Sequence, residues 1–183
     1  MHKDLQEVLI STEELSAGIE KLGEKISADY EGRCLTLVGV LKGSVFFLTD
    51  LARRVTSDVR LDFMMLSSYS GERSTGVVRI LLDLKESIEG SDVLIVEDIV
   101  DSGLTMSYML QNLGTRRPRS LEVCTLLDKP SRRRAEVPIK YTGFTIPDKF
   151  VVGYGLDYNG IYRNLPYVGV LKREIIEGNK TCR

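Results

Sequence analysis

The chemically most informative residues of this chain lie between Val93 and Thr105. The first four, Val93 to Val96, are apolar and predict a short buried strand, which the acids Glu97 and Asp98 close. A helix-like stretch begins at Met106. Between them lies a small, hydroxyl-rich turn that contains Asp101, Ser102, Gly103, Leu104 and Thr105. Free backbone N–H groups in such a turn and at a helix N-terminus favour an anion, so the segment predicts a phosphate site.

Two acids beside a phosphate site need an explanation, because like charges repel each other. Glu97 and Asp98 fit a ligand that arrives with Mg²⁺, or one that carries sugar hydroxyls, which donate hydrogen bonds to carboxylates. The hydroxyls of Ser102 and Thr105 add donors, and Gly103 lets the backbone approach the ligand closely. The segment by itself therefore predicts a sugar phosphate that binds together with a metal.

Several other kinds of chemistry do not fit this composition. The chain has one histidine, His2, which argues against a Ser-His-Asp triad and against a histidine-ligated metal. The cysteines Cys34, Cys124 and Cys182 lack metal-site spacing. Cys34 and Cys124 fall in apolar runs and are expected to be buried free thiols, as in a reducing cytosol. A G-x-x-x-x-G-K-[ST] motif and a G-x-G-x-x-G motif after a strand are both missing, which excludes P-loop kinases and dinucleotide-binding proteins.

Composition and charge are those of an ordinary globular domain. The 183 residues are 43% hydrophobic and 28% charged, with a net charge of −1. These values predict one domain over residues 1–183 and give no electrostatic reason to expect nucleic acid or a membrane as partner. The N-terminus lacks the apolar region of a signal peptide, so a cytoplasmic protein is expected. Arginine clusters at 116–119 and 132–134 are interpreted as solvated or subunit-contact faces.

The elements that must position these residues follow from the hydrophobic pattern. Ser11–Glu14 has the capping-box pattern, and apolar residues at helical spacing after it predict a helix over 12–29. Further helices are expected at 45–55 and 106–113. Strands are expected at 34–40, 59–67, 77–84, 93–96, 121–127, 141–146, 151–155 and 167–171. This order predicts an α/β fold with an open, mostly parallel twisted sheet, helices on both faces and ligands at the carboxyl ends of the strands.

Four segments, in the same order along the chain, resemble the type I phosphoribosyltransferases, and within them the hypoxanthine-guanine phosphoribosyltransferases of purine salvage. They are LKGS at 41–44, SSYSG at 67–71, VLIVEDIVDSGLT at 93–105 and FVVGYGLDYNGIYRNLP at 150–166. The resemblance implies the type I fold with a small hood segment, a lid loop at about 68–76 and a purine-reading segment at about 129–166. It also implies Mg²⁺-dependent transfer of ribose 5-phosphate from 5-phosphoribosyl-1-pyrophosphate (PRPP) to N9 of hypoxanthine or guanine, giving IMP or GMP and pyrophosphate.

The resemblance implies a role for each residue on the PRPP side. Glu97 and Asp98 contact the ribose hydroxyls, directly or through Mg²⁺, and Asp101 is the base at N7 of the purine. The 5′-phosphate is held by Asp101, Ser102, Gly103, Leu104 and Thr105; the family often has Thr at position 102 and Lys at position 104. Pyrophosphate is bound by Lys42, Gly43 and Arg163, and by Ser68 and Tyr69 of the lid. In the family, the peptide bond that corresponds to Leu41–Lys42 can be cis.

On the purine side, the resemblance implies that Lys129 donates to O6, Phe150 stacks on the base and Val151 offers backbone groups to the base edge. Asp157 is implied to lie near the C2 substituent and to hold a second Mg²⁺, usually through water. The implied metal ligands are thus Glu97, Asp98 and Asp157. A homodimer or homotetramer is implied as well. Acceptance of xanthine depends on the backbone near residues 151–157 and is left open.

Two other functions are compatible with a PRPP-binding fold. A transcriptional or RNA-binding regulator that senses PRPP predicts an added DNA-binding domain, a basic face or the loss of the base-reading residues. The chain starts almost at its first helix and keeps Lys129 and Asp157, so this alternative is disfavoured. A pyrimidine-specific transferase is disfavoured by the segment from Phe150 to Asp157.

Overall fold

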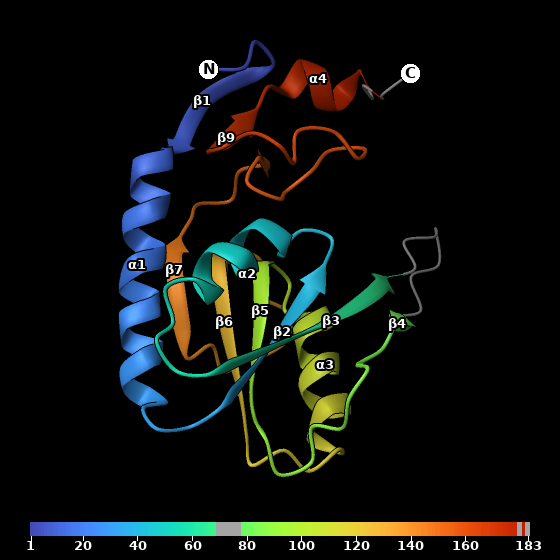
Figure 1. The fold of residues 1–183 in the computed structure, drawn as a ribbon. Helices are drawn as coiled ribbons and strands as arrows, with labels where there is room; N and C mark the ends of the chain where they lie inside the picture. The colour runs from blue at the N-terminus through green and yellow to red at the C-terminus, as the bar shows by residue number, and fades with distance from the viewer. Residues whose placement is uncertain (69–77, 179–180, 182–183) are drawn as a thin grey trace.

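The computed structural model describes residues 1–68, 78–178 and 181, and Figure 1 shows how their helices and strands are arranged. The helices are α1 (Thr12–Asp29), α2 (Val45–Ala52), α3 (Leu104–Gly114) and α4 (Arg173–Glu177), with a short 3-10 helix, η1, at Pro130–Arg132. The strands are β1 (Leu5–Ile10), β2 (Leu35–Leu41), β3 (Val59–Ser68), β4 (Val78–Leu82), β5 (Asp92–Val100), β6 (Ser120–Asp128), β7 (Tyr141–Thr145), β8 (Val151–Val152) and β9 (Val168–Leu171).

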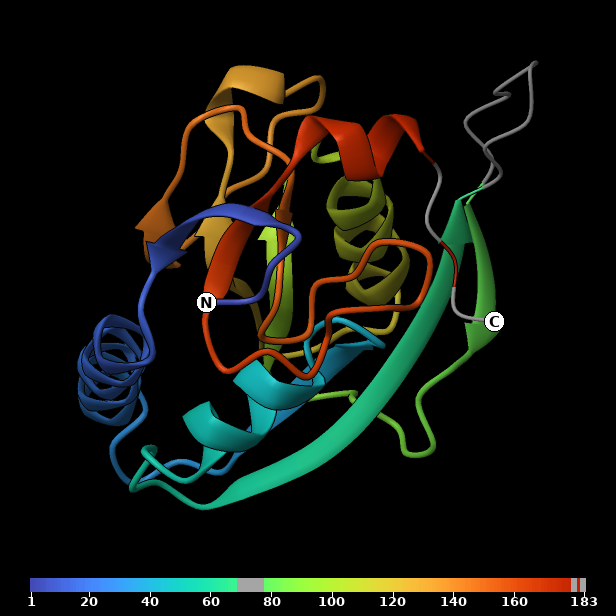
Figure 2. The same cartoon turned by 90° about the horizontal axis from the view of Figure 1, so that it is seen from above.

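These strands form two separate sheets. The larger sheet has the order β4-β3-β2-β5-β6-β7 and is parallel except at its edge, where β4 runs antiparallel to β3. The smaller sheet is antiparallel, with the order β1-β9-β8. Seen from above, β1, β9 and α4 lie over one end of the larger sheet (Figure 2). We call the smaller sheet, together with α4 and the chain between β8 and β9, the hood. The predicted α/β fold with an open, mostly parallel sheet and a small hood is confirmed.

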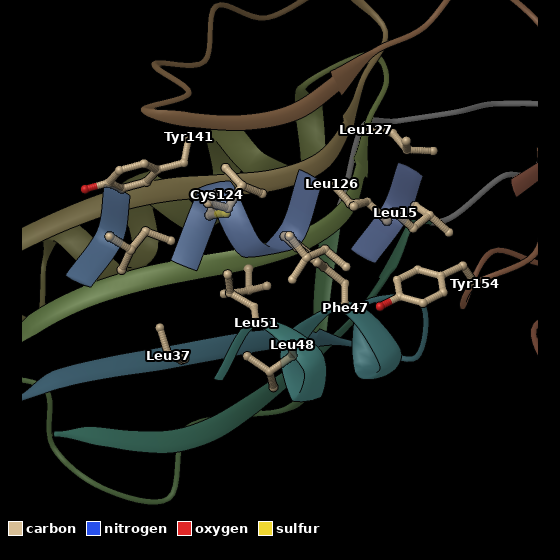
Figure 3. Close-up of a cluster of buried hydrophobic side chains, with 14 of the residues drawn as sticks. Leu15, Leu37, Phe47, Leu48, Leu51, Cys124, Leu126, Leu127, Tyr141 and Tyr154 are labelled. Atoms are coloured by element: carbon tan, nitrogen blue, oxygen red, sulfur yellow. The ribbon is translucent and has the colours of Figure 1, made fainter. Parts of the chain in front are cut away.

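Helices cover both faces of the larger sheet. Side chains alternate along its strands, so each strand contributes residues to both faces. Leu35 and Leu37 of β2 belong to the hydrophobic cluster that also contains the buried residues of α1 and α2. Val38 and Val40 of the same strand belong to a second cluster, which includes the buried residues of α3. Figure 3 shows part of the first cluster between the sheet and the two helices. The near-continuous apolar runs of β2, β5 and β6 are thus explained by burial on both sides.

The helix α1 confirms the element predicted over 12–29. The side chain of Ser11 accepts a hydrogen bond from the backbone N–H of Glu14 (3.2 Å), and the Glu14 carboxylate accepts one from the N–H of Ser11 (2.8 Å). Leu15, Ile19 and Ile26 are buried against the sheet side of the helix. The helix predicted at 45–55 ends earlier, at residue 52. Among the helices of the described residues, none is long and apolar enough to cross a membrane.

The strand β5 is longer than its apolar run predicts. It spans Asp92–Val100, so Glu97 and Asp98 lie inside the strand, and the prediction that they close it is wrong. Pairing with β6 continues beyond the acids as far as the pair Val100 and Asp128. The main-chain hydrogen bonds of a sheet do not depend on side-chain polarity, which is why the apolar pattern underestimates the strand. The two acids are therefore held by the sheet and not by a turn.

The hood differs most from the predicted elements. The strand expected at 151–155 is reduced to residues 151–152, because the chain turns through positive φ angles at Gly153, Tyr154 and Gly155. The strand β1 and the helix α4 were not predicted. The strand β1 pairs with β9, far away in the sequence, and this non-local pairing leaves only a weak local signal.

The two cysteines within the described residues differ in exposure. Cys124 in β6 is buried, as expected, and burial raises the pKa of its thiol. Cys34 is exposed, so the prediction that it is buried is wrong. The apolar run that contains Cys34 becomes strand only from Leu35 onward, and the cysteine lies just outside the sheet. Both thiols are free.

Candidate active site

A cavity of about 140 Å³ lies where β5 ends and α3 begins. It is lined by Glu97, Ile99, Val100, Asp101, Ser102, Gly103, Thr105 and Met106. Gly103, the N-cap of α3, has a φ of 80°, and a Cβ there would lie 2.6 Å from the carbonyl oxygen of Ala135. Only glycine suits both constraints. Apart from Leu104, whose side chain is exposed, the residues of the predicted phosphate cradle line this one cavity beside a helix N-terminus.

Glu97 and Asp98 form an acidic pair next to the cradle, in which Asp98 is buried and Glu97 is half-buried. Burial raises the pKa of Glu97 well above its usual value, and the charge of Asp98 adds to the effect. Burial also raises the pKa of Asp98. One carboxylate oxygen of Glu97, Oε2, is buried and has no hydrogen-bond partner within the described part of the chain. Such a pair favours a ligand that brings positive charge or hydroxyl donors to it.

Glu97→Gln is expected to stabilise the protein at alkaline pH. The carboxyl group of Glu97 has an ordinary pKa of 4.5, which folding raises. In the pH window between these two pKa values, the folded protein binds more protons than the unfolded one. The stability of the parent should therefore fall as the pH rises through this window, and Gln removes that loss. Urea unfolding at pH 8 without divalent cations should therefore show a higher unfolding free energy for Glu97→Gln than for the parent, and the difference should shrink at lower pH.

The matched control for this change is Glu136→Gln, because Glu136 is exposed and has no hydrogen bond or ion pair with the described residues. It should leave the unfolding free energy at pH 6 and pH 8 unchanged. If Glu97→Gln is no more stable than the parent at pH 8, the ionised carboxylate of Glu97 does not destabilise the folded protein.

The predicted pyrophosphate loop packs against the acidic pair. The peptide bond between Leu41 and Lys42, at the end of β2, is cis. A Cβ on Gly43 would lie 1.7 Å from Oδ2 of Asp98, and a Cβ on Gly155 would lie 1.9 Å from the carbonyl oxygen of Gly43. Gly155 also has a positive φ of 102°. Three segments that are far apart in the sequence therefore meet here, and they can do so only because two of them carry glycine.

Asp157 and Arg163 are paired with each other in the hood. Their charged atoms Oδ1 and Nη2 are 2.6 Å apart, and Nη1 of Arg163 donates to the carbonyl oxygen of Gly155 (2.6 Å). Among residues 1–68, 78–178 and 181, no group of three or more His, Cys, Asp or Glu side chains could hold a metal ion. Asp157 therefore does not join Glu97 and Asp98 in one ligand cluster.

Lys129 and Phe150 lie together on the purine side of the predicted site. Lys129, directly after β6, is 5% exposed, and its Nζ donates to the carbonyl oxygen of Lys149 (2.9 Å). The Phe150 side chain is 44% exposed, with its ring edge-on to that of Tyr158 at 5.6 Å. Val151, the first residue of β8, is buried. A buried amine next to an exposed aromatic ring is an arrangement that can read and stack on a planar base.

The arginine clusters behave differently from each other. Arg116 and Arg117 pair with Asp83 and Glu89, in agreement with an ordinary charged surface, whereas Arg119 pairs with Asp92, which is buried. For Arg133 of the second cluster the interpretation as a solvated or subunit-contact face is wrong, because its side chain is only 20% exposed. Arg132 is about half exposed, in agreement with that interpretation, and also has two acidic neighbours. Arg132 lies near Asp101 and Asp148, and Arg133 pairs with Asp128. Neither Arg132 nor Asp148 is predicted as a site residue from the sequence, and the local signal that could have suggested it is Pro130, which favours a tight turn directly after Lys129.

The predicted lid lies almost entirely outside the described residues. Ser68 is the last residue of β3, and Tyr69, with the rest of the loop 68–76, falls outside the described ranges. The role of this loop as a lid and the pyrophosphate contacts of Ser68 and Tyr69 stay predictions.

Comparison with known proteins agrees with this geometry. Residues 9–159 match the phosphoribosyl transferase domain family. A hypoxanthine-guanine phosphoribosyltransferase of Staphylococcus aureus is 51% identical over 176 residues, which cover 96% of this chain and 98% of that protein. The bifunctional protein TilS/HprT of Listeria monocytogenes is 52% identical over 176 residues, and here the chain spans only 27% of the relative's length.

Solved structures of hypoxanthine phosphoribosyltransferases have a similar fold. The crystal structure of a hypoxanthine phosphoribosyltransferase from Staphylococcus aureus has a TM-score of 0.92 at 50% identity, with 96% of both chains covered. The hypoxanthine phosphoribosyltransferase of Trypanosoma cruzi in complex with the product IMP has a TM-score of 0.90 at 43% identity, covering 96% of this chain and 98% of that one.

Proposed function

Because this chain belongs to the phosphoribosyl transferase domain family, we propose that it acts as a hypoxanthine-guanine phosphoribosyltransferase of purine salvage. It transfers ribose 5-phosphate from PRPP to N9 of hypoxanthine or guanine and releases pyrophosphate. One observation carries the proposal: the phosphate cradle and the acidic pair lie at the carboxyl end of β5, and Lys129, whose amine reaches the residue before Phe150, follows the carboxyl end of the neighbouring strand β6. We further propose that it is cytoplasmic and works as a homodimer or homotetramer.

The residues of the site divide the chemistry among them. The bond from C1′ of ribose to pyrophosphate breaks while N9 of the purine forms its bond to C1′, and positive charge develops on the sugar. The cradle at 101–105 binds the 5′-phosphate through backbone N–H groups and hydroxyls. Glu97 and Asp98 accept hydrogen bonds from the ribose hydroxyls, and Asp101 accepts the proton at N7 of the purine.

On the other side of the reacting bond, Lys42, Gly43 and Arg163 bind the leaving pyrophosphate. Lys129 donates to O6 of the purine and Phe150 stacks on its ring. The buried Oε2 of Glu97 and the raised pKa of its carboxyl suit a hard cation, which prefers oxygen ligands. We therefore assign Mg²⁺ to Glu97 and Asp98, with Asp157 as ligand of a second ion. When bound, Mg²⁺ supplies positive charge to the pyrophosphate.

A panel of bases assayed with PRPP tests this function. Hypoxanthine and guanine should give IMP and GMP, whereas adenine and uracil should give no product, and xanthine measures how wide the specificity is. Activity should disappear in excess chelator and return when Mg²⁺ is added in excess. A chain that uses uracil, or none of these bases, would refute the proposal, and full activity in chelator would refute the metal assignment.

Lys129→Ala is expected to weaken hypoxanthine binding and to reduce discrimination against adenine. The buried amine opposes the amino group of adenine with a second donor, so its removal should relieve this mismatch while it weakens binding of 6-oxopurines. The ratio of kcat/KM for hypoxanthine over adenine should fall by about tenfold or more. Lys140→Ala, on a partly exposed lysine outside the site, is the control. If Lys129→Ala rejects adenine as strongly as the parent does, O6 is read elsewhere.

A further inference from the structure

Arg132 lies between two acids at the border of the proposed site. Its Nε is 3.6 Å from Oδ1 of Asp101, and its Nη1 is 3.6 Å from Oδ1 of Asp148. The Nζ of Lys129 lies 3.8 Å from the same oxygen of Asp148. These distances are longer than hydrogen bonds and bring charges of opposite sign together. A chain of alternating charges therefore connects Asp101 with Lys129.

The turn η1 brings the two positively charged residues of this charge network, Lys129 and Arg132, together. The backbone N–H of Arg132 donates to the carbonyl oxygen of Lys129 (3.3 Å), and Pro130 stands at the start of the turn. In a 3-10 turn, side chains three residues apart lie on the same side. Proline at the start favours this backbone conformation in advance. Lys129 and Arg132 can thus both approach Asp148, which reaches them from the loop between β7 and β8.

Main-chain hydrogen bonds tie this turn to the phosphate cradle. The N–H of Lys129 donates to the carbonyl oxygen of Val100 (3.0 Å). The N–H groups of Arg134 and Ala135 both donate to the carbonyl oxygen of Ser102 (2.8 and 3.1 Å). The segment that carries the central arginine is therefore anchored on both sides of that residue. Its guanidinium is placed by the backbone, although about half of the side chain is exposed.

The carboxylate of Asp101 needs such a neighbour. Its Oδ1 is buried and has no hydrogen-bond partner within the described part of the chain. An unpartnered buried oxygen leaves the carboxylate without a group that fixes its rotation about the side chain. The guanidinium of Arg132 is the cation that faces this oxygen. A positive charge at this place attracts Oδ1 and so selects one orientation of the carboxylate.

We propose that Arg132 is a positioning residue for the proposed phosphoribosyl transfer. It holds the carboxylate of Asp101 in the orientation that accepts the N7 proton, and through Asp148 it holds Lys129 in place for O6. This inference rests on the proposed function. Because Arg132 acts through these side chains and not on PRPP, its loss lowers kcat far more than it raises the KM for PRPP.

The test compares Arg132→Gln with Arg134→Gln, the matched control. Arg134 lies two residues further along, is exposed, and its side chain has no hydrogen bond or ion pair with the described residues. Arg132→Gln should lower kcat by about tenfold or more, whereas the KM for PRPP should change by less than about threefold. Arg134→Gln should leave both constants within about twofold. Arg132→Lys keeps the charge and should recover most of the lost kcat, although it lacks the planar fork.

A double variant decides whether Arg132 acts through Asp101. If it does, Arg132→Gln should lower kcat much less in the Asp101→Asn background than in the parent, because the carboxylate that it positions is already gone. An equal loss in both backgrounds, an unchanged kcat in Arg132→Gln, or a rise only in the purine KM would each overturn the assignment. An inactive parent in the same assay would refute the proposed function instead. Thermal unfolding of all variants identifies any loss of activity that comes from unfolding.

Discussion

Asp101→Asn should lower the kcat of IMP formation by about 10²–10⁴-fold, the usual contribution of a general base. Asn has nearly the same size and shape as Asp but cannot take up the proton at N7 in the same way. The phosphate cradle should remain intact, because the main-chain bonds from Arg134 and Ala135 to Ser102 do not involve this side chain. PRPP affinity, measured by calorimetry, should therefore stay within about threefold of the parent value.

The control for this variant is Asp58→Asn. Asp58 is an exposed acid just before β3, at the opposite end of the larger sheet, and its side chain has no hydrogen bond or ion pair with the described residues. It should keep the parent kcat. A parent-like kcat in Asp101→Asn would show that the N7 proton is handled by another group. A large loss of PRPP affinity would instead mean that Asp101 mainly shapes the cradle.

Gly43→Ala is expected to damage the site strongly. The added methyl group would lie 1.7 Å from Oδ2 of Asp98 and 2.5 Å from its Cγ. Asp98 cannot easily turn away, because its other carboxylate oxygen accepts a hydrogen bond from the N–H of Ile99 (2.9 Å). Either the pyrophosphate loop or the acid must move. A displacement of about 1 Å at a reacting centre can cost about 10²-fold, so kcat/KM for PRPP should fall by about this factor.

Steady-state kinetics at varied PRPP and thermal unfolding measure this effect, with Gly114→Ala as the control. Gly114 ends α3, has no positive φ, and a Cβ there meets no atom within 4 Å. It should leave activity unchanged. Parent-like kcat/KM in Gly43→Ala would mean that the loop does not need its close contact with Asp98.

Local sequence patterns were sufficient for those parts of the site that neighbouring residues build. Asp101, Ser102, Gly103 and Thr105 line one cavity beside a helix N-terminus, at the place where hydroxyls and glycine predict a phosphate cradle. The helix α1 begins at the capping box of Ser11 and buries the predicted apolar face. Alternation of side chains along β2 explains the two-sided core. In each case the residue types follow one another at the period of a helix, a strand or a turn, so the local pattern predicts which side chains are buried or capped.

The tertiary structure alone decided the features that depend on distant segments. Glu97 and Asp98 extend a strand because β6 pairs beyond the apolar run, and the desolvation of their carboxyl groups by the surrounding chain raises their pKa values. Gly43 and Gly155 are needed where separate loops meet, and Arg132 gains its acidic neighbours only when β5, η1 and the loop before β8 come together. Burial and charge proximity are properties of the packed chain, and no local pattern of residue types encodes them.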